Sequence, residues 1–236
     1  MESVNLQQQA IEYLKQNKYA ELIALYEQCI EANPDEITHY WYLGLAWLLI
    51  GDESAAQTIW MSVFFQGTLD KIEGWTAELV KILEAEALWQ FQADNLSLAK
   101  NIYEQIKEIN SQDVKTYRNL GTIYQRLGAL EKAEEIYRQI IEVNPEDLEG
   151  YINLSNLLIQ QYKIDEAIKI YREGIVHHPK ESSLYFNLAM ALKYSGRAQE
   201  AINIFAESLQ LCPDNLAFKL ENARTFPILY NSPEEI

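Results

Sequence analysis

Three asparagines, Asn119, Asn153 and Asn187, recur 34 residues apart in the second half of the sequence. A side-chain amide both donates and accepts hydrogen bonds, so it can pair with a peptide backbone without reading the side chains of the ligand. One such amide in each repeat would form a ladder along an extended chain. The alternative is that each amide bonds locally. We take the three asparagines as candidate peptide-binding groups.

Further polar side chains are expected on the same face as the asparagines. They are Lys115, Arg118, Gln125, Arg126, Asn156, Lys193 and Tyr194. Four cations on one face are unusual in a chain that has 19 Lys and Arg against 35 Asp and Glu, a formal charge of −16. They indicate an acidic ligand or a carboxylate terminus. The alternative is an ordinary solvated helix face.

The asparagines belong to a segment of 34 residues that is repeated three times without a gap, as 114–147, 148–181 and 182–215. Position 4 is Tyr, position 7 Leu, position 20 Ala and position 32 Pro in every copy, and position 24 is aromatic. A period of this length with these residues in register resembles tetratricopeptide repeats, which are pairs of antiparallel helices.

The pattern inside each repeat predicts two amphipathic helices. In the fourth repeat, Tyr117, Leu120 and Tyr124 fall on one helical stripe. The small residues at positions 8 and 20 let the two helices approach closely, and Gly128 marks the end of the first helix. The expected fold is all-α: a tetratricopeptide helical-hairpin solenoid that winds as a right-handed superhelix.

About six repeats are expected, at 3–36, 37–70, 80–113, 114–147, 148–181 and 182–215. Nine extra residues, 71–79, continue the apolar spacing, so we expect one long helix from about residue 70 to 92. A capping helix at 216–225 should follow the last repeat. The tail 226–236 is expected to be extended, or to begin a following domain that the sequence does not contain.

The second repeat is unusually aromatic. Its large rings are Tyr40, Trp41, Tyr42, Trp47, Trp60, Phe64 and Phe65. We expect them to fill a bulky core and to pack against the insertion, because large aromatic side chains mostly serve burial. An aromatic groove for a ligand is the alternative.

Composition excludes several classes of function. The acidic surface repels phosphate backbones and anionic lipid, so neither nucleic acid nor membrane is an expected partner. The N-terminus has no signal sequence, and Cys29 and Cys212 are expected to be free thiols, which favours a cytoplasmic location. The three histidines do not form a metal set, and no phosphate-binding loop or catalytic motif is present. We expect no cofactor, no metal and no enzymatic activity.

Two groups of segments carry a narrower resemblance. The first is Tyr40–Gln57 with Trp75–Leu79 and Leu83–Glu86, and the second is Phe226–Tyr230 with Pro233–Ile236. They resemble the N-terminal repeat region of large cyanobacterial-type proteins of the SPINDLY class, which are similar to O-linked N-acetylglucosamine transferases. The resemblance implies that the repeats precede a glycosyltransferase or methyltransferase, and that asparagines at position 6 bind peptide.

These observations predict a protein-interaction module that holds an extended peptide in the concave groove of repeats four to six. The first hypothesis is the substrate-recognition part of a larger SPINDLY-like glycosyltransferase. The second is a free-standing assembly adaptor, or a scaffold that associates with its own copies and carries no enzyme.

Overall fold

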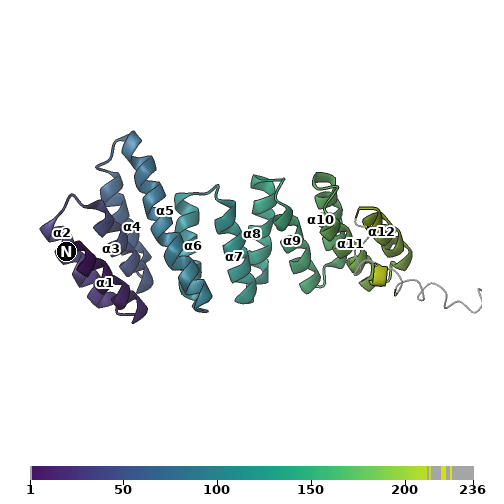
Figure 1. Cartoon of the computed structure of the whole chain (residues 1–236), viewed down its shortest axis with the longest axis horizontal. Coiled ribbons are helices and arrows are strands. Elements are labelled where there is room, and N and C mark those ends of the chain that lie inside the picture. The colour runs from purple at the N-terminus through teal and green to yellow at the C-terminus, as the bar shows by residue number, and fades with distance from the viewer. Residues whose placement is uncertain (1, 212, 214–218, 222–223, 225–236) are drawn as a thin grey trace, which may run out of the picture. The chain divides into compact units, whose positions relative to one another are not determined.

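The computed structural model describes residues 2–211, 213, 219–221 and 224, and within this part of the chain the secondary structure is entirely helical. The helices are α1 (Glu2–Lys15), α2 (Tyr19–Ala32), α3 (Ile37–Leu49), α4 (Glu53–Phe64), α5 (Leu69–Gln92), α6 (Leu96–Ile109), α7 (Val114–Arg126), α8 (Leu130–Val143), α9 (Leu148–Gln160), α10 (Ile164–His177), α11 (Ser182–Tyr194) and α12 (Ala198–Leu211) (Figure 1). The all-α prediction is confirmed.

The chain divides into two compact units, Met1–Asp113 and Val114–Ile236, where the sequence predicts one continuous stack. In the first unit α1 pairs with α2, α3 with α4, and α5 with α6. In the second, α7 pairs with α8, α9 with α10, and α11 with α12. Consecutive helices therefore form the hairpins that the 34-residue period predicts.

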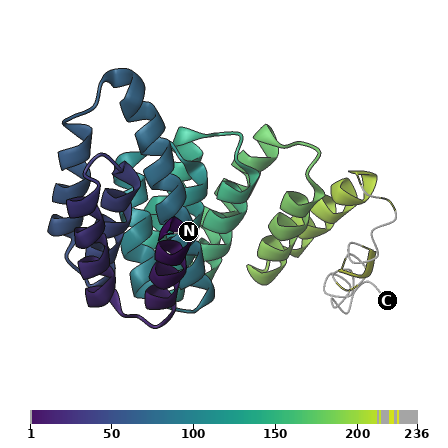
Figure 2. The ribbon, with the colours of Figure 1, turned by 60° about the vertical axis from the view of Figure 1, so that its left-hand side comes forward.

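The long helix predicted across the insertion is present as α5, which has 24 residues, whereas α3, α7, α9 and α11 have 13 each. Its first turns project beyond the neighbouring helices of the same unit (Figures 1 and 2). Of the expected capping helix 216–225, residues 219–221 and 224 are described and are helical. The remainder of that segment and the tail 226–236 lie outside the described residues.

Close helix contact holds each hairpin of the second unit together. Ala133, Ala167 and Ala201 are fully buried at position 20. On the facing helix, a Cβ added at Gly121 would collide with the ring of Tyr137. Small residues are therefore required at both contacts, as the sequence predicts.

The first unit departs from the repeat pattern at two positions, one buried and one half-buried. Leu22 replaces the usual Ala at position 20 and is fully buried beside Tyr26. Glu86 replaces the usual Leu at position 7. Burial raises the pKa of Glu86, and its carboxylate accepts a hydrogen bond of 2.7 Å from the amide of the buried Gln90. This bond offsets part of the cost of burying the carboxyl group.

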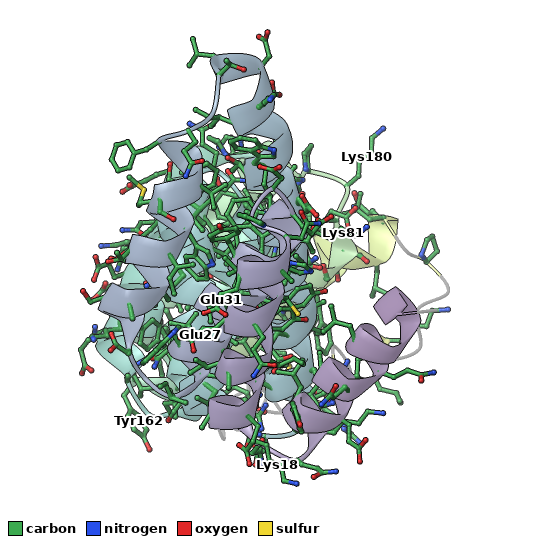
Figure 3. The ribbon with its side chains drawn as sticks, turned by 90° about the vertical axis from the view of Figure 1, so that its left-hand side faces the viewer. Lys18, Glu27, Glu31, Lys81, Tyr162 and Lys180 are labelled. Carbon is green, nitrogen blue, oxygen red and sulfur yellow. The ribbon has the colours of Figure 1, made fainter. Side chains whose placement is uncertain are left out.

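The turn inside every hairpin uses one residue in the left-handed region of backbone space, always at position 15 of the repeat. The residues are Asn17, Gly51, Asp94, Gly128, Tyr162 and Gly196. Glycine, asparagine and aspartate tolerate this conformation, whereas a bulky aromatic residue does not favour it. Tyr162, with φ of 62°, is 90% exposed and its side chain points away from the helices (Figure 3). No packing therefore offsets its strain.

We predict that Tyr162→Gly raises the free energy of unfolding by roughly 0.5–1 kcal/mol, because glycine removes the left-handed strain. Thermal and urea unfolding measure the change. The matched control is Tyr194→Gly, in the last turn of α11, where the exposed tyrosine is helical and glycine should destabilise. Equal effects of the two substitutions would contradict the strain.

We predict that Ala167→Trp lowers the free energy of unfolding by at least about 1–3 kcal/mol, because the indole has no room between α9 and α10. Lys169→Trp, on the exposed side of α10, is the control and should change stability little. An unchanged melting transition in Ala167→Trp would show that the assigned register of the repeats is wrong.

Candidate functional site

The exposed face of the first helices in repeats four to six is formed by positions 2, 6, 9 and 13, which share one helical stripe. We call it the A face. On α7 it comprises Lys115, Asn119, Thr122 and Arg126; on α9, Glu149, Asn153, Asn156 and Gln160; on α11, Ser183, Asn187, Met190 and Tyr194. All twelve side chains are exposed or half-buried. The opposite side of each helix is in the core, so these positions are the ones open to a ligand.

Asn119, Asn153 and Asn187 occupy the sixth residue of α7, α9 and α11, and each is half-buried. Within the described part of the chain, none of the three side-chain amides makes a hydrogen bond. Each amide keeps its donors and its acceptor available to a ligand.

Arg118, at position 5, points to the next repeat instead. Its guanidinium forms ion pairs with Asp147 at 2.8 Å and with Glu149 at 3.0 Å. The carboxylate of Asp147 is 5% exposed and also accepts a hydrogen bond of 2.7 Å from the backbone N–H of Gly150. Arg118 therefore joins α7 to the capped start of α9, and its charge is already neutralised.

Position 12 forms links of the same kind. The amide of Gln125 donates to Gln160 of α9 at 2.6 Å, and Lys193 forms an ion pair of 2.9 Å with Glu221. Hydrogen bonds from Lys193 and Arg224 lower the pKa of Glu221. Arg118 and Gln125 therefore link α7 to α9, partly through Glu149 and Gln160 of the A face, whereas the amides at position 6 take no part in these links.

The other candidate residues have different surroundings. Asn156 accepts a hydrogen bond of 2.6 Å from the hydroxyl of Tyr171, whose pKa burial raises. Lys115 and Arg126 are exposed, and each has a partner within the chain. Tyr194 is 72% exposed at the end of α11. The predicted set thus separates into the three open amides, the exposed Tyr194 and side chains that are already engaged.

Asp147 is a residue that the sequence reasoning missed. It is the N-cap of α9 as well as the partner of Arg118. The available signal was position 34 of the repeat, which is acidic in Glu36, Asp147 and Glu181, each the N-cap of the following helix. An acidic residue directly before an amphipathic stripe is a helix-start signal.

The described residues contain no group of three or more His, Cys, Asp or Glu side chains that could hold a metal ion. Among those residues there is likewise no helix whose length and apolar character would suffice to cross a bilayer.

Protein-family models described as tetratricopeptide repeat match residues 8–61, 114–147 and 182–215. The last two ranges begin at Val114 and Ser182, where the first and third copies of the aligned segment begin. No curated protein matches the chain.

Solved structures share the fold at low sequence identity. A MamA RS-1 double mutant aligns with a TM-score of 0.56 and 11% identity, over 66% of this chain and 86% of that one. MamA 41-end from Desulfovibrio magneticus RS-1 aligns with a TM-score of 0.53 and 12% identity, over 62% of this chain and 82% of that one. YrrB is described as a tetratricopeptide protein with an unusual peptide-binding site. It aligns with a TM-score of 0.55 and 15% identity, over 84% of this chain and 97% of that one.

We predict that Arg118→Gln lowers the free energy of unfolding by about 1 kcal/mol, because the buried carboxylate of Asp147 loses a charge-assisted bond. The control is Arg172→Gln, which removes an ion pair with Glu200 between side chains that are 51% and 43% exposed. Because that pair is solvated, its loss should lower the free energy of unfolding by about 0.5 kcal/mol or less. Urea unfolding measures both. A loss in Arg118→Gln no larger than in the control would contradict a structural role for Arg118.

Proposed function

Because this chain is a tetratricopeptide repeat protein, we propose that it binds an extended peptide along the A face of α7, α9 and α11. Tetratricopeptide repeats serve as protein-interaction modules. The observation that carries the proposal is the set of three amides, Asn119, Asn153 and Asn187, at one position of successive repeats and without a hydrogen bond among the described residues. Each amide pairs with one peptide group of the ligand.

The ligand is recognised through its backbone rather than through a negative charge. An acidic ligand would have to compete with Asp147 and Glu149 for Arg118, and with Glu221 for Lys193. Such competition gives up existing charge-assisted bonds, whereas pairing with the three amides gives up only their bonds to water. A carboxylate contact with Lys115 or Arg126 adds to the binding without being required.

The fold is compatible with this role. YrrB, which is described as having a peptide-binding site, shares the fold at 15% identity. This likeness supports the use of a tetratricopeptide stack to bind peptide, while the position of the site in this chain rests on its own amides.

The larger architecture is a separate part of the proposal. The segments Tyr40–Gln57 and Phe226–Tyr230 resemble the repeat region of SPINDLY-class proteins, so we propose that the bound peptide is presented to an attached glycosyltransferase. A coding sequence that continues past Ile236 into an α/β glycosyltransferase segment would support this arrangement. A stop codon at that point would favour the free-standing adaptor.

A peptide array probed with the purified chain tests the peptide site. We expect bound peptides to be lost when Asn119, Asn153 and Asn187 are all changed to Ala, with helicity unchanged by circular dichroism. Binding that persists in this triple variant would move the interaction to another surface and overturn the proposal.

A single substitution gives the size of the effect. Asn153→Ala should weaken the binding of an array-selected peptide about fivefold to tenfold, since one or two hydrogen bonds of about 0.5–1.5 kcal/mol each are lost. The melting temperature should not change, because the amide has no bond within the described chain. Asn203→Ala, on the exposed side of α12, is the control. Parallel losses of stability and affinity would mark Asn153 as structural instead.

A further inference from the structure

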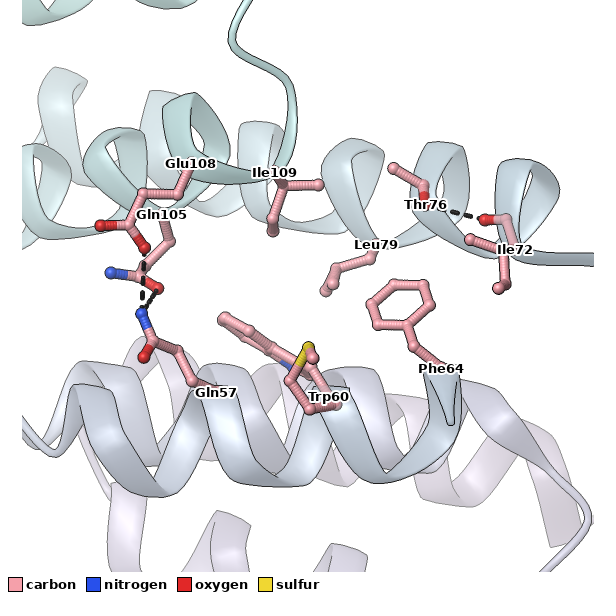
Figure 4. Close-up of a pocket in the computed structure, with 10 residues that line it drawn as sticks. Gln57, Trp60, Phe64, Ile72, Thr76, Leu79, Gln105, Glu108 and Ile109 are labelled. Atoms are coloured by element: carbon pink, nitrogen blue, oxygen red, sulfur yellow. Dashed lines mark hydrogen bonds between the residues drawn. The ribbon is translucent and has the colours of Figure 1, made fainter. Parts of the chain in front are cut away.

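The N-terminal unit contains a pocket of about 530 Å³ between α4, α5 and α6 (Figure 4). Its apolar lining comes from all three helices: Trp60, Met61 and Phe64 of α4, Ile72 and Leu79 of α5, and Ile109 of α6. In α4 these residues, together with Gln57, fall on one stripe at helical spacing. We call this pocket the α4–α5 groove.

The groove exists because α5 does not cover α4. In three other hairpins the second helix packs against the next helix, as α2 does on α3, α8 on α9 and α10 on α11, whereas α4 and α5 approach each other less closely. α5 is held to α3 instead. Glu78 accepts hydrogen bonds from Thr38 at 3.1 Å and from Trp41 at 3.3 Å. The place that a covering helix takes in other repeats is therefore open.

Hydrogen bonds to α6 close one end of the groove. The amide of Gln57 donates to Gln105 at 2.9 Å and to Glu108 at 3.0 Å (Figure 4). These bonds fix α4 relative to α6, so the groove has two rigid sides. Glu108 is exposed and leaves a negative charge at this end.

Exposed apolar side chains lie close in the sequence to the residues that line the groove. Met61, in the lining, is 48% exposed, while Phe65, directly after α4, and Leu69, the first residue of α5, are 81% and 87% exposed. Exposed apolar side chains gathered in this way mark a site of interaction. Within the aromatic second repeat, Trp41 is fully buried in the core, while Phe64 lines the groove.

The net negative charge of the N-terminal unit favours a partner with positive charge. Residues 1–113 contain 6 Lys and no Arg against 18 Asp and Glu, whereas residues 114–236 contain 13 Lys and Arg against 17 Asp and Glu. Most of the excess negative charge thus belongs to the unit with the groove. Two copies meeting at this groove would bring like charges together, whereas a partner with Lys or Arg beside its apolar residues would be attracted.

We infer that the α4–α5 groove binds an amphipathic helix of a partner protein that carries Lys or Arg on both sides of its apolar stripe. The partner helix takes the place of the helix that covers the corresponding surface in other repeats, and it buries Met61, Phe65 and Leu69. This site lies in the N-terminal unit and uses none of the residues of the A face.

The test uses three synthetic helical peptides of 15 residues with Leu at i, i+3, i+4, i+7 and i+11, and with Lys, Gln or Glu at the flanking positions. Fluorescence anisotropy measures their binding to the whole chain at about 0.15 M salt, where the Debye length is about 8 Å. We expect the Lys peptide to bind at least about tenfold more tightly than the Gln peptide, and the Glu peptide not to bind.

Substitutions locate the site. Met61→Gln should weaken binding of the Lys peptide about tenfold, because it removes an apolar contact. Met61→Leu keeps an apolar side chain and should retain binding. Val176→Gln, which changes a 78% exposed apolar residue of α10, is the matched control and should have less than about a twofold effect. The triple Asn→Ala variant of the A face should bind the Lys peptide normally.

Three results would overturn the inference. The first is equal binding of the three peptides, or no binding of the Lys peptide. The second is that the triple Asn→Ala variant loses binding of the Lys peptide while Met61→Gln retains it, which would place the peptide on the A face. The third is a dimer in analytical ultracentrifugation that Met61→Gln dissociates, which would make a second copy the occupant.

Discussion

The close approach of the two helices in each hairpin is the contact on which the other features depend. It needs a small residue on each helix, such as Gly121 beneath the ring of Tyr137 and Ala167 at a fully buried position. Because this contact fixes the rotation of each first helix about its axis, it determines which positions face the core. Positions 2, 6, 9 and 13 are then left on the surface of α7, α9 and α11.

The exposed positions of the C-terminal unit differ in function because their neighbours differ. Positions 5 and 12 lie beside the next repeat, so Arg118 and Gln125 form bonds that hold α7 and α9 together. Position 6 has no polar neighbour within bonding distance in the described chain, so its amides remain available. The same helix thus supplies both the links between repeats and the groups that we propose for ligand binding.

The sequence predicts a large part of this arrangement. The period of 34 places the hairpins, because small and aromatic residues recur in register. The apolar spacing across the inserted residues 71–79 places α5, because local spacing determines a helix. The pairing of Arg118 with Asp147 was not predicted, since it depends on which way a long side chain turns between two helices. The gap between α4 and α5 was not predicted either, because it follows from Glu78 binding Thr38 and Trp41 rather than from any pattern along the chain.

Scanning N-methylation of an array-selected peptide tests whether the three asparagines recognise the peptide backbone. Each methyl group removes one backbone donor and leaves the side chains in place. We expect methylation at a few spaced residues to abolish binding and alanine substitution of the peptide to have little effect. In the Asn→Ala variants, the same methyl groups should cause no further loss of affinity. Binding that tolerates every methyl group but fails when one peptide side chain is truncated would show that the asparagines do not recognise the peptide backbone.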